Sequence, residues 1–201
     1  SFLKLRALDA ARRMRVPVLM RAENTLSAMP DGTGLRGIFK RLYVNWIFRR
    51  CAGFLCVGSD NRRYYEAHDL EASRLFFMPY AVDNDVFRTQ ADEAMASEPL
   101  LRGKLGLDPG RPVILFAGKL QRRKHPETLL DAFSRLDRDA LGQPYLLYIG
   151  DGELSHILQG MARRYGDDVR LLGFRNQTEM PAFYSLADVF VLASECEPWG
   201  L

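Results

Sequence analysis

Short apolar runs alternate along the chain with segments in which apolar residues recur every three or four positions. Unbroken runs of this kind, rich in β-branched and aromatic residues, are typical of strands buried on both faces of a parallel sheet. We predict strands at Val16–Met20, Ala52–Val57, Leu75–Met78, Val113–Ala117, Tyr145–Ile149, Val169–Leu172 and Val189–Ala193. The three- and four-residue spacing predicts helices at Phe2–Met14, Leu35–Arg50, Asn61–His68, Arg102–Leu107, Pro126–Asp137, Glu153–Tyr165 and Thr178–Leu186. Repeated strand–helix units indicate the α/β class, with doubly wound parallel sheets.

The stretch that follows the strand at Val113–Ala117 has the layout of an anion-binding site. Gly118 ends the strand, and four cations follow within six residues, namely Lys119, Arg122, Arg123 and Lys124. A helix then begins at Pro126, so the cations lie between a buried strand and a helix N-terminus, where α/β proteins bind anions. Cations in a loop are, taken alone, equally consistent with a solvated surface. No P-loop is present, and no GxGxxG motif follows this strand. We call residues 118–125 the cationic loop.

The other strands of the second half also end in glycine or polar residues. Gly150, Gly173 and Ser194 each follow a predicted strand, as Gly118 does. The carboxyl ends of parallel strands meet at one edge of a sheet, so these residues are expected to line one crevice.

The predicted helix at Leu35–Arg50 has two interpretations. Its apolar stripe consists of Leu35, Ile38, Phe39, Leu42, Tyr43, Trp46 and Ile47, and its cations are Arg36, Lys40, Arg41, Arg49 and Arg50, with no acidic residue between them. The favoured interpretation is a helix that packs its stripe on a sheet and keeps its basic face in water. The alternative is a helix that lies on an anionic membrane surface.

Composition excludes several classes of protein but identifies no binding partner. The chain has 201 residues and a formal net charge of +3, which is too weakly basic to indicate a nucleic-acid-binding protein. Its 3 cysteines show no CxxC spacing, so neither a disulfide framework nor a zinc site is expected. The sequence contains no apolar run long enough for a transmembrane helix. Its first residues lack the pattern of a signal peptide, and they do not include a starting Met, so we expect the chain to be a piece of a longer protein.

Six ordered segments carry a resemblance to a known family. They are Met78-Pro79-Tyr80-Ala81-Val82-Asp83, Gly118-Lys119-Leu120 with Lys124, Gly150-Asp151-Gly152-Glu153-Leu154, Val169–Gly173, Tyr184–Val189 leading to Ser194, and Glu197-Pro198-Trp199-Gly200-Leu201. Together they resemble the retaining glycosyltransferases of family 4. That family is built on the GT-B fold, and each segment is weak by itself.

The resemblance implies an α/β fold of the GT-B type, with two Rossmann-like doubly wound parallel-sheet domains that are both incomplete here. Residues 1–82 would be the back half of the N-terminal, acceptor-side domain, and residues 83–110 the crossover or linker. Residues 111–201 would be the C-terminal, nucleotide-sugar-binding domain, truncated at its C-terminus. The second glutamate of the family's motif would fall eight positions after Glu197, beyond Leu201. We therefore expect the fragment to be inactive alone.

The same resemblance implies a reaction and a set of site residues. The reaction would transfer a sugar from a UDP-, GDP- or ADP-sugar to an acceptor hydroxyl with retention of configuration, without a metal or other cofactor. Lys119 and Lys124 would neutralise the leaving diphosphate, and Glu197 would bind hydroxyls of the donor sugar. Further donor contacts would come from Gly118, Gly173, Phe174, Arg175, Trp199, Gly200 and Leu201. The acceptor would be a glycan, a lipid or a small molecule, as in polysaccharide biosynthesis. The protein would be cytoplasmic, with peripheral contact at the inner membrane face through Leu35–Arg50.

Two other functions remain open at this stage. One is a non-catalytic module that binds anionic lipid or nucleic acid through Leu35–Arg50 and Lys119–Lys124. The other is a nucleotide-sugar epimerase of the GT-B fold, although the segment Glu197–Gly200 favours transfer. No nucleic-acid partner is expected for the favoured reading.

Overall fold

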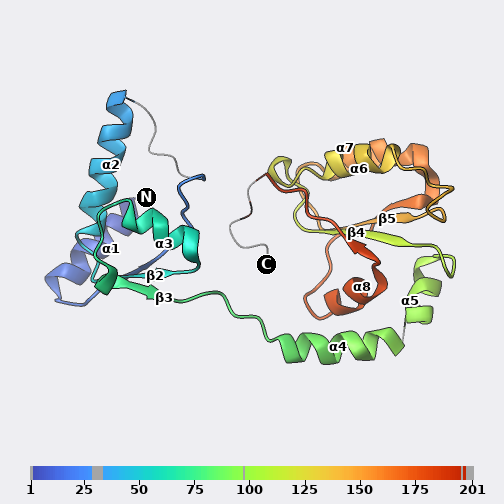
Figure 1. Ribbon diagram of the computed structural model, residues 1–201, viewed down its shortest axis with the longest axis horizontal. Coiled ribbons are helices and arrows are strands. Elements are labelled where there is room, and N and C mark those ends of the chain that lie inside the picture. The colour runs from blue at the N-terminus through green and yellow to red at the C-terminus, as the bar shows by residue number, and fades with distance from the viewer. Residues whose placement is uncertain (1, 29–33, 97, 196, 198–201) are drawn as a thin grey trace. The chain divides into compact units, whose positions relative to one another are not determined.

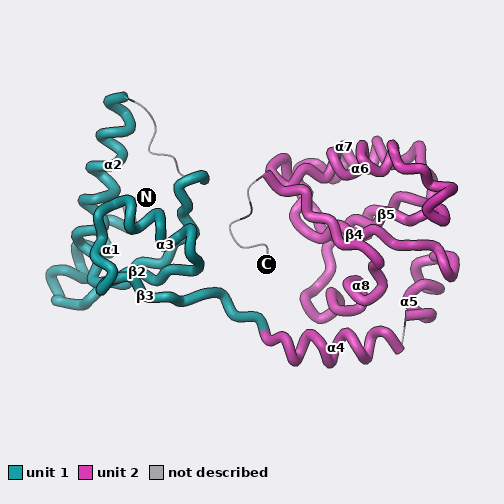
Figure 2. The backbone as a smooth tube through the Cα atoms, in the orientation of Figure 1, with its two compact units in different colours: residues 1–82, 197–201 teal, residues 83–196 magenta. Residues whose placement is uncertain are grey.

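The chain forms two compact units, which are described separately. The structure is a computed structural model that describes residues 2–28, 34–96, 98–195 and 197. Unit 1 comprises Ser1–Val82 and Glu197–Leu201, and unit 2 comprises Asp83–Cys196 (Figure 2).

Unit 2 is built on a four-stranded parallel sheet. Its strands are β4 (Val113–Ala117), β5 (Tyr145–Ile149), β6 (Val169–Leu171) and β7 (Val189–Phe190), in the order β6-β5-β4-β7. The helices between them are α6 (Pro126–Ser134), α7 (Ser155–Ala162) with the 3₁₀ segment η3 (Arg163–Asp168), and α8 (Met180–Leu186). The predicted strands at 113–117 and 145–149 have the predicted bounds, whereas β6 and β7 are shorter than predicted.

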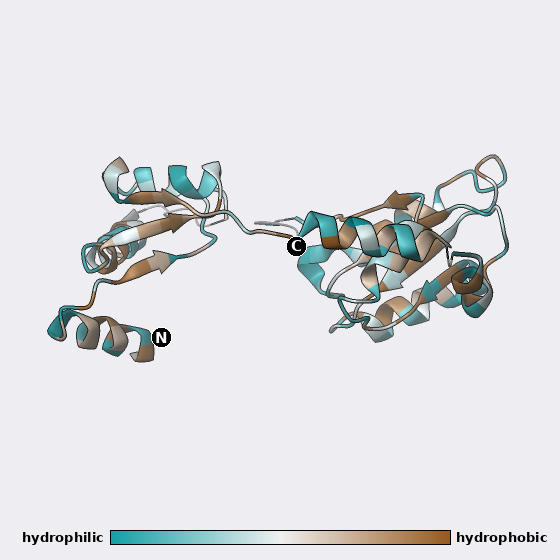
Figure 3. Cartoon of the chain, turned by 90° about the horizontal axis from the view of Figure 1, so that it is seen from below, coloured by the Kyte–Doolittle hydropathy of each residue, from teal (hydrophilic) through white to brown (hydrophobic). Residues whose placement is uncertain are grey.

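Both faces of this sheet are covered, which explains its continuous apolar runs. Alternate residues of a strand point to opposite faces. Phe116 and Tyr148 accordingly pack with Leu130 of α6 and Leu158 of α7. The residues of opposite parity pack on the other side with Phe183 of α8, and they include Val113, Leu115, Tyr145 and Leu147. Figure 1 shows α6 and α7 on one side of the sheet and α8 on the other, and Figure 3 shows the strands coloured largely as hydrophobic.

Two helices occupy the segment that the sequence predicts as a crossover or linker, residues 83–110. They are α4 (Asn84–Ala96) and α5 (Glu98–Leu105). Ser185 Oγ of α8 donates a hydrogen bond to the carbonyl oxygen of Ala91, and Leu101 and Leu105 pack on the core beneath α8. The weak periodicity of this segment therefore belongs to helices that are only partly buried.

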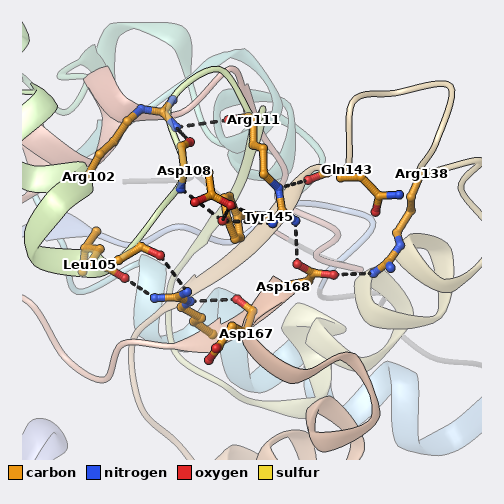
Figure 4. Close-up of polar contacts among 11 residues, drawn as sticks. Arg102, Leu105, Asp108, Arg111, Arg138, Gln143, Tyr145, Asp167 and Asp168 are labelled. Carbon is orange, nitrogen blue, oxygen red and sulfur yellow. Dashed lines mark hydrogen bonds and ion pairs between the residues drawn. The ribbon is translucent and has the colours of Figure 1, made fainter.

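A polar network holds the amino-terminal ends of three strands together (Figure 4). Arg111, just before β4, pairs with Asp168 at 2.5 Å and donates to the Tyr145 hydroxyl at 3.0 Å. Asp168 also pairs with Arg138 at 3.1 Å. This end of the sheet is opposite the cationic loop, so the network supports the sheet without taking part in the crevice.

Unit 1 contains a three-stranded parallel sheet in the order β1-β2-β3, namely β1 (Leu19–Arg21), β2 (Gly53–Cys56) and β3 (Leu75–Phe77). Its helical segments are α1 (Phe2–Arg13), α2 (Gly34–Phe48), α3 (Ser59–Glu66) and the 3₁₀ segment η1 (Ala72–Arg74). Its core cluster consists of Phe48, Cys51, Phe54, Cys56, Tyr64, Tyr65 and Leu75. The sequence predicted the first strand at Val16–Met20, three residues too early at its start.

The favoured interpretation of α2 is wrong about which face of the helix packs on the core. Gly37 and Phe48 are buried, and Val44 and Ile47 pack on the core. Most of the predicted inward stripe is exposed, with Leu35 at 74%, Ile38 at 57%, Phe39 at 69%, Leu42 at 60%, Tyr43 at 50% and Trp46 at 41%. The three- and four-residue spacing identifies an apolar face of the helix. Contacts with neighbouring segments of the same unit decide which face of the helix turns inward. Arg41 lies at the side of the helix and donates to the carbonyl oxygen of Ala67 at 2.8 Å, which ties α2 to the end of α3 (Ser59–Glu66).

Candidate functional site

The order of strands in unit 2 defines where a ligand would bind. From β4 the chain runs outward through β5 to β6, and it then returns to place β7 on the other side of β4. In open α/β sheets, ligands bind at the carboxyl ends of the strands where the order reverses. In unit 2 this point lies between the loop after β4, which is the cationic loop, and the loop after β7.

Glycines allow the loops after β4 and β5 to cross in direct contact. The Gly118 N–H donates to the carbonyl oxygen of Ile149 at 2.9 Å, and the Leu120 N–H donates to that of Asp151 at 3.0 Å. Gly150 has φ +129°, and a Cβ there would lie 1.9 Å from the carbonyl oxygen of Gly118. No side chain fits at such a distance, so the backbone at residue 150 requires glycine.

The loop after β6 joins the same layer. The Gly150 N–H donates to the carbonyl oxygen of Gly173 at 2.9 Å, so Gly118, Gly150 and Gly173 line neighbouring strand ends. Phe174 follows with 72% of its surface exposed. Arg175 is half-buried, with its guanidinium 5.7 Å from the Phe183 ring centre. Phe174 therefore presents an open aromatic ring at the edge of the strand ends.

The cationic loop ends in a tight turn before α6. Arg122–Lys124 forms a 3₁₀ turn, and His125 adopts the left-handed conformation with φ 48° and ψ 46°. Pro126 then occupies the start of α6, where its missing N–H is not needed. The Arg122 N–H is bonded to Glu153 Oε1 at 3.3 Å, which ties the loop to the segment before α7.

The two lysines of the predicted site differ in their surroundings. Lys119 is exposed, whereas Lys124 is buried, with 9% of its surface accessible. Burial lowers the pKa of Lys124 below its ordinary value, and the charge of Arg123 lowers it further. A cation held in partial burial close to a helix N-terminus gains more from a bound anion than a solvated one does.

The loop after β7 lies against the cationic loop. The Glu195 N–H donates to the carbonyl oxygen of Arg123 at 3.0 Å, and Glu195 Oε2 lies 3.6 Å from His125 Nε2. Sequence reasoning missed this contact, because it depends on β7 lying next to β4, which no local pattern reveals. Glu197 follows two residues later and is half-buried. Trp199, Gly200 and Leu201, also predicted as donor contacts, lie outside the described residues.

A hollow of about 390 Å³ opens beside the cationic loop, lined by Arg122, His125, Glu127, Thr128, Leu154 and Ile157. Within the described part of the chain, no group of three or more His, Cys, Asp or Glu side chains could hold a metal ion. In the same residues, no helix has the length and apolar character needed to span a bilayer.

Comparison with known proteins identifies the second half most clearly. A family model described as "Glycosyl transferases group 1" matches residues 97–201. A D-inositol 3-phosphate glycosyltransferase of Segniliparus rotundus is 30% identical over 145 residues, which cover 69% of this chain and 30% of that protein. A GDP-mannose-dependent alpha-(1-6)-phosphatidylinositol monomannoside mannosyltransferase of Mycobacterium tuberculosis is 33% identical over 147 residues, covering 72% of this chain and 37% of that protein.

Solved structures support the fold. The Anabaena protein Alr3699/HepE, crystallised with UDP and glucose, matches with a TM-score of 0.69 at 17% identity and covers 96% of this chain. WaaG, a glycosyltransferase involved in lipopolysaccharide biosynthesis, matches with a TM-score of 0.67 at 17% identity and covers 90%. The α/β fold of the GT-B type, with two incomplete Rossmann-like parallel-sheet domains, is thereby confirmed.

The matched region spans about a third of the curated relatives' length, at 30% and 37% for the two proteins named above. It spans about half of the solved chains, at 50% and 51%.

Proposed function

This chain belongs to the glycosyl transferases group 1 family, and we propose that it carries the donor site of an enzyme that transfers a sugar from a nucleotide-sugar to an acceptor hydroxyl. The observation that carries the proposal is the contact between the cationic loop and the loop after β7 at the point where strand order reverses. Positive charge, a helix N-terminus and a crevice at the strand ends coincide there.

In the proposed reaction, negative charge develops on the distal phosphate of the nucleoside diphosphate as the glycosidic bond breaks. Lys119 and Lys124 would stabilise this charge, since they lie in one loop whose backbone is held by hydrogen bonds before the reaction begins. The partial burial of Lys124 strengthens such an interaction, because little water screens it. The N–H groups at the start of α6 carry partial positive charge, and they add to the positive charge of the two lysines in the loop.

The remaining contacts belong to the same proposal. Phe174 would stack on the nucleotide base, with Gly173 and Arg175 beside it, and Glu197 would accept hydrogen bonds from hydroxyls of the donor sugar. The backbone of Gly118, Trp199, Gly200 and Leu201 would approach the diphosphate or the sugar. The donor would be a UDP-, GDP- or ADP-sugar. UDP is bound in the HepE structure, and the mycobacterial relative is named as GDP-mannose-dependent.

The finer features of the function rest on the resemblance to the retaining enzymes of family 4. They are retention of configuration, independence of metal and cofactor, a glycan, lipid or small-molecule acceptor, and inactivity of these 201 residues alone. The location would be cytoplasmic, at or near the inner membrane face. A nucleotide-sugar epimerase or a non-catalytic binding module would be the alternative.

Calorimetric titration of the 201-residue chain with UDP, GDP and ADP tests the donor site. We expect saturable binding of one nucleotide, and we expect Lys124→Ala to weaken it about tenfold or more, because an interaction with a charged group is worth about 1.5–3 kcal/mol. Arg135→Ala removes an exposed cation just after the last residue of α6 and serves as the matched control. Binding that falls equally in both variants, or no binding of any nucleotide, would contradict the proposal.

A further inference from the structure

His125 occupies a position where the backbone conformation favours a different residue. Its φ of 48° and ψ of 46° lie in the left-handed region, between the 3₁₀ turn Arg122–Lys124 and the first residue of α6. Glycine takes this conformation without steric cost, whereas a residue with a β-carbon takes it at some cost. The chain therefore places an imidazole where glycine would be the unstrained choice, and the contacts of the ring offer a reason.

The ring of His125 approaches the loop after β7. Its Nε2 lies 3.6 Å from Oε2 of Glu195, which is close enough for an ion pair when the imidazole is protonated. The backbone N–H of the same Glu195 donates to the carbonyl oxygen of Arg123 at 3.0 Å. The loop after β7 thus meets the cationic loop at two neighbouring points, and one of these contacts depends on the charge of His125.

The other charged groups around His125 act on its proton in both directions. They are the cations Arg122, Arg123 and Lys124 and the carboxylates Glu127, Glu153 and Glu195. The cations oppose a positive charge on the imidazole, and the carboxylates favour it. Glu127 lies in α6, and Glu153 lies before α7, where it accepts the backbone N–H of Arg122 at 3.3 Å. Of these three carboxylates, only that of Glu195 belongs to the loop after β7, so only its pairing with His125 joins the two loops.

We propose that His125 is a positioning residue which, when protonated, pairs with Glu195 and holds the loop after β7 against the cationic loop. This inference rests on the proposed donor site, because the two loops meet at the point where strand order reverses. Protonation of His125 also adds positive charge next to Lys124 and offsets the negative charge of Glu195. Both effects favour a bound diphosphate, so the site binds its nucleotide more tightly when His125 carries a proton.

A double-mutant cycle of His125→Asn and Glu195→Gln tests the pair. Asparagine tolerates the left-handed backbone and takes up no proton in this pH range, and glutamine keeps the shape of Glu195 without its charge. The wild type, the two single variants and the double variant are titrated calorimetrically with UDP, GDP and ADP in turn, at about pH 6 and pH 8. A terminal phosphate changes its own charge over this range, but that change cancels in the cycle because all four proteins bind the same ligand at each pH.

We expect the affinity for the bound nucleotide to show a coupling of about two- to fivefold at the lower pH, which is the size typical of a partly exposed ion pair. At the higher pH the coupling should vanish, because a neutral imidazole forms no ion pair. His125→Gly also suits the left-handed backbone, and it should give the same coupling as His125→Asn. Agreement between these two variants would assign the effect to the charge of the ring and not to the backbone.

Two matched cycles serve as controls. His156 is an exposed histidine of α7, and His156→Gln should show no coupling with Glu195→Gln at either pH. Glu127 lines the same hollow as His125, and Glu127→Gln should couple with His125→Asn more weakly than Glu195→Gln does. Circular dichroism checks that each variant is folded.

Chemical denaturation measures the same pair without a ligand. The cycle of His125→Asn and Glu195→Gln should show a coupling in the free energy of unfolding of unit 2 at about pH 6 that disappears at about pH 8, because the unfolded chain does not hold the two residues together. If no nucleotide binds but this coupling appears, the proposed donor site fails and the pairing of the two side chains stands.

Three results would overturn the role of His125 and leave the donor site in place. They are nucleotide binding without coupling at the lower pH, a coupling of equal size at both pH values, and a stronger coupling of His125 to Glu127 than to Glu195. A coupling seen in unfolding but not in nucleotide binding would also overturn it, because the pair would then form without positioning the site.

Discussion

Lys124 shows how one residue can be costly for folding and useful for binding. Lys124 is largely buried in the turn that forms the cationic loop, and burial and the charge of Arg123 lower its pKa. A lowered pKa means that the folded protein binds the proton less tightly than the unfolded chain does. The residue therefore reduces stability at neutral pH, and a bound diphosphate would offset that loss.

This argument predicts a pH dependence of stability. Between the lowered pKa of the folded state and the unfolded value of about 10.4, the unfolded chain holds more protons, so stability should rise with pH. Urea denaturation at about pH 7 and pH 10 measures the free energy of unfolding. At the lower pH this free energy should be higher for Lys124→Met than for the wild type. Between the two pH values it should rise less for Lys124→Met than for the wild type. The same stability change with pH in both proteins would refute this account of Lys124.

The backbone conformation of His125, the next residue, could not have been predicted from its residue type alone. Its left-handed backbone is uncommon outside glycine, although His is among the residues that tolerate it. From the sequence it was one polar residue among several in a charged loop. The structure shows that its conformation closes the turn and directs its ring toward Glu195.

At the scale of elements, the loops after β4 and β5 depend on backbone contact at two glycines. The sequence placed Gly118 and Gly150 at strand ends, but it gave no sign that their backbones touch. That contact follows from the pairing of β4 with β5, in which Ala117 lies opposite Ile149.

Two matched substitutions test this crossing. Gly150→Ala should lower the free energy of unfolding by about 3 kcal/mol or more, because the new methyl group meets the Gly118 carbonyl and the φ of +129° is strained for alanine. Gly160→Ala, in the middle of α7 with open space around it, should raise that free energy by about 0.5–1 kcal/mol. Chemical denaturation measures both, and similar values for the two would contradict the geometry.

The central elements were predictable because their patterns are local. β4 and β5 are continuous apolar runs ended by glycine, and Pro126 marks the start of α6. The direction of α2, helix α4 and the contact between Glu195 and Arg123 were not predictable from such patterns, whereas the helix predicted at Arg102–Leu107 overlaps α5. Each of the first three depends on which neighbour a face meets, and that is decided by chain topology.

At the scale of the whole molecule, the two units have separate cores. The clusters around Phe116 and Leu115 belong to unit 2, and the cluster around Phe54 belongs to unit 1. Residues 78–83 connect the units without forming a helix or strand. Cooperative unfolding reflects the residues that share one core, so each unit should unfold by itself.

Calorimetry of the 201-residue chain should therefore show two transitions. Asp168→Asn removes the negative charge that pairs with both Arg111 and Arg138. It should lower the free energy of unfolding of unit 2 by about 1–3 kcal/mol. The transition of unit 1 should keep its midpoint. A single transition that moves as a whole would show that the two cores unfold together.

The hydrogen-bonded crossing of loops has a further consequence for the timing of site formation. The amides of Gly118, Leu120, Gly150 and Leu154 are bonded to neighbouring carbonyl groups in the free protein. Their hydrogens should therefore exchange slowly with solvent deuterium before any ligand is added. A binding site that is already ordered loses little conformational entropy when it is occupied, so its affinity depends on contacts made and not on folding of the loop.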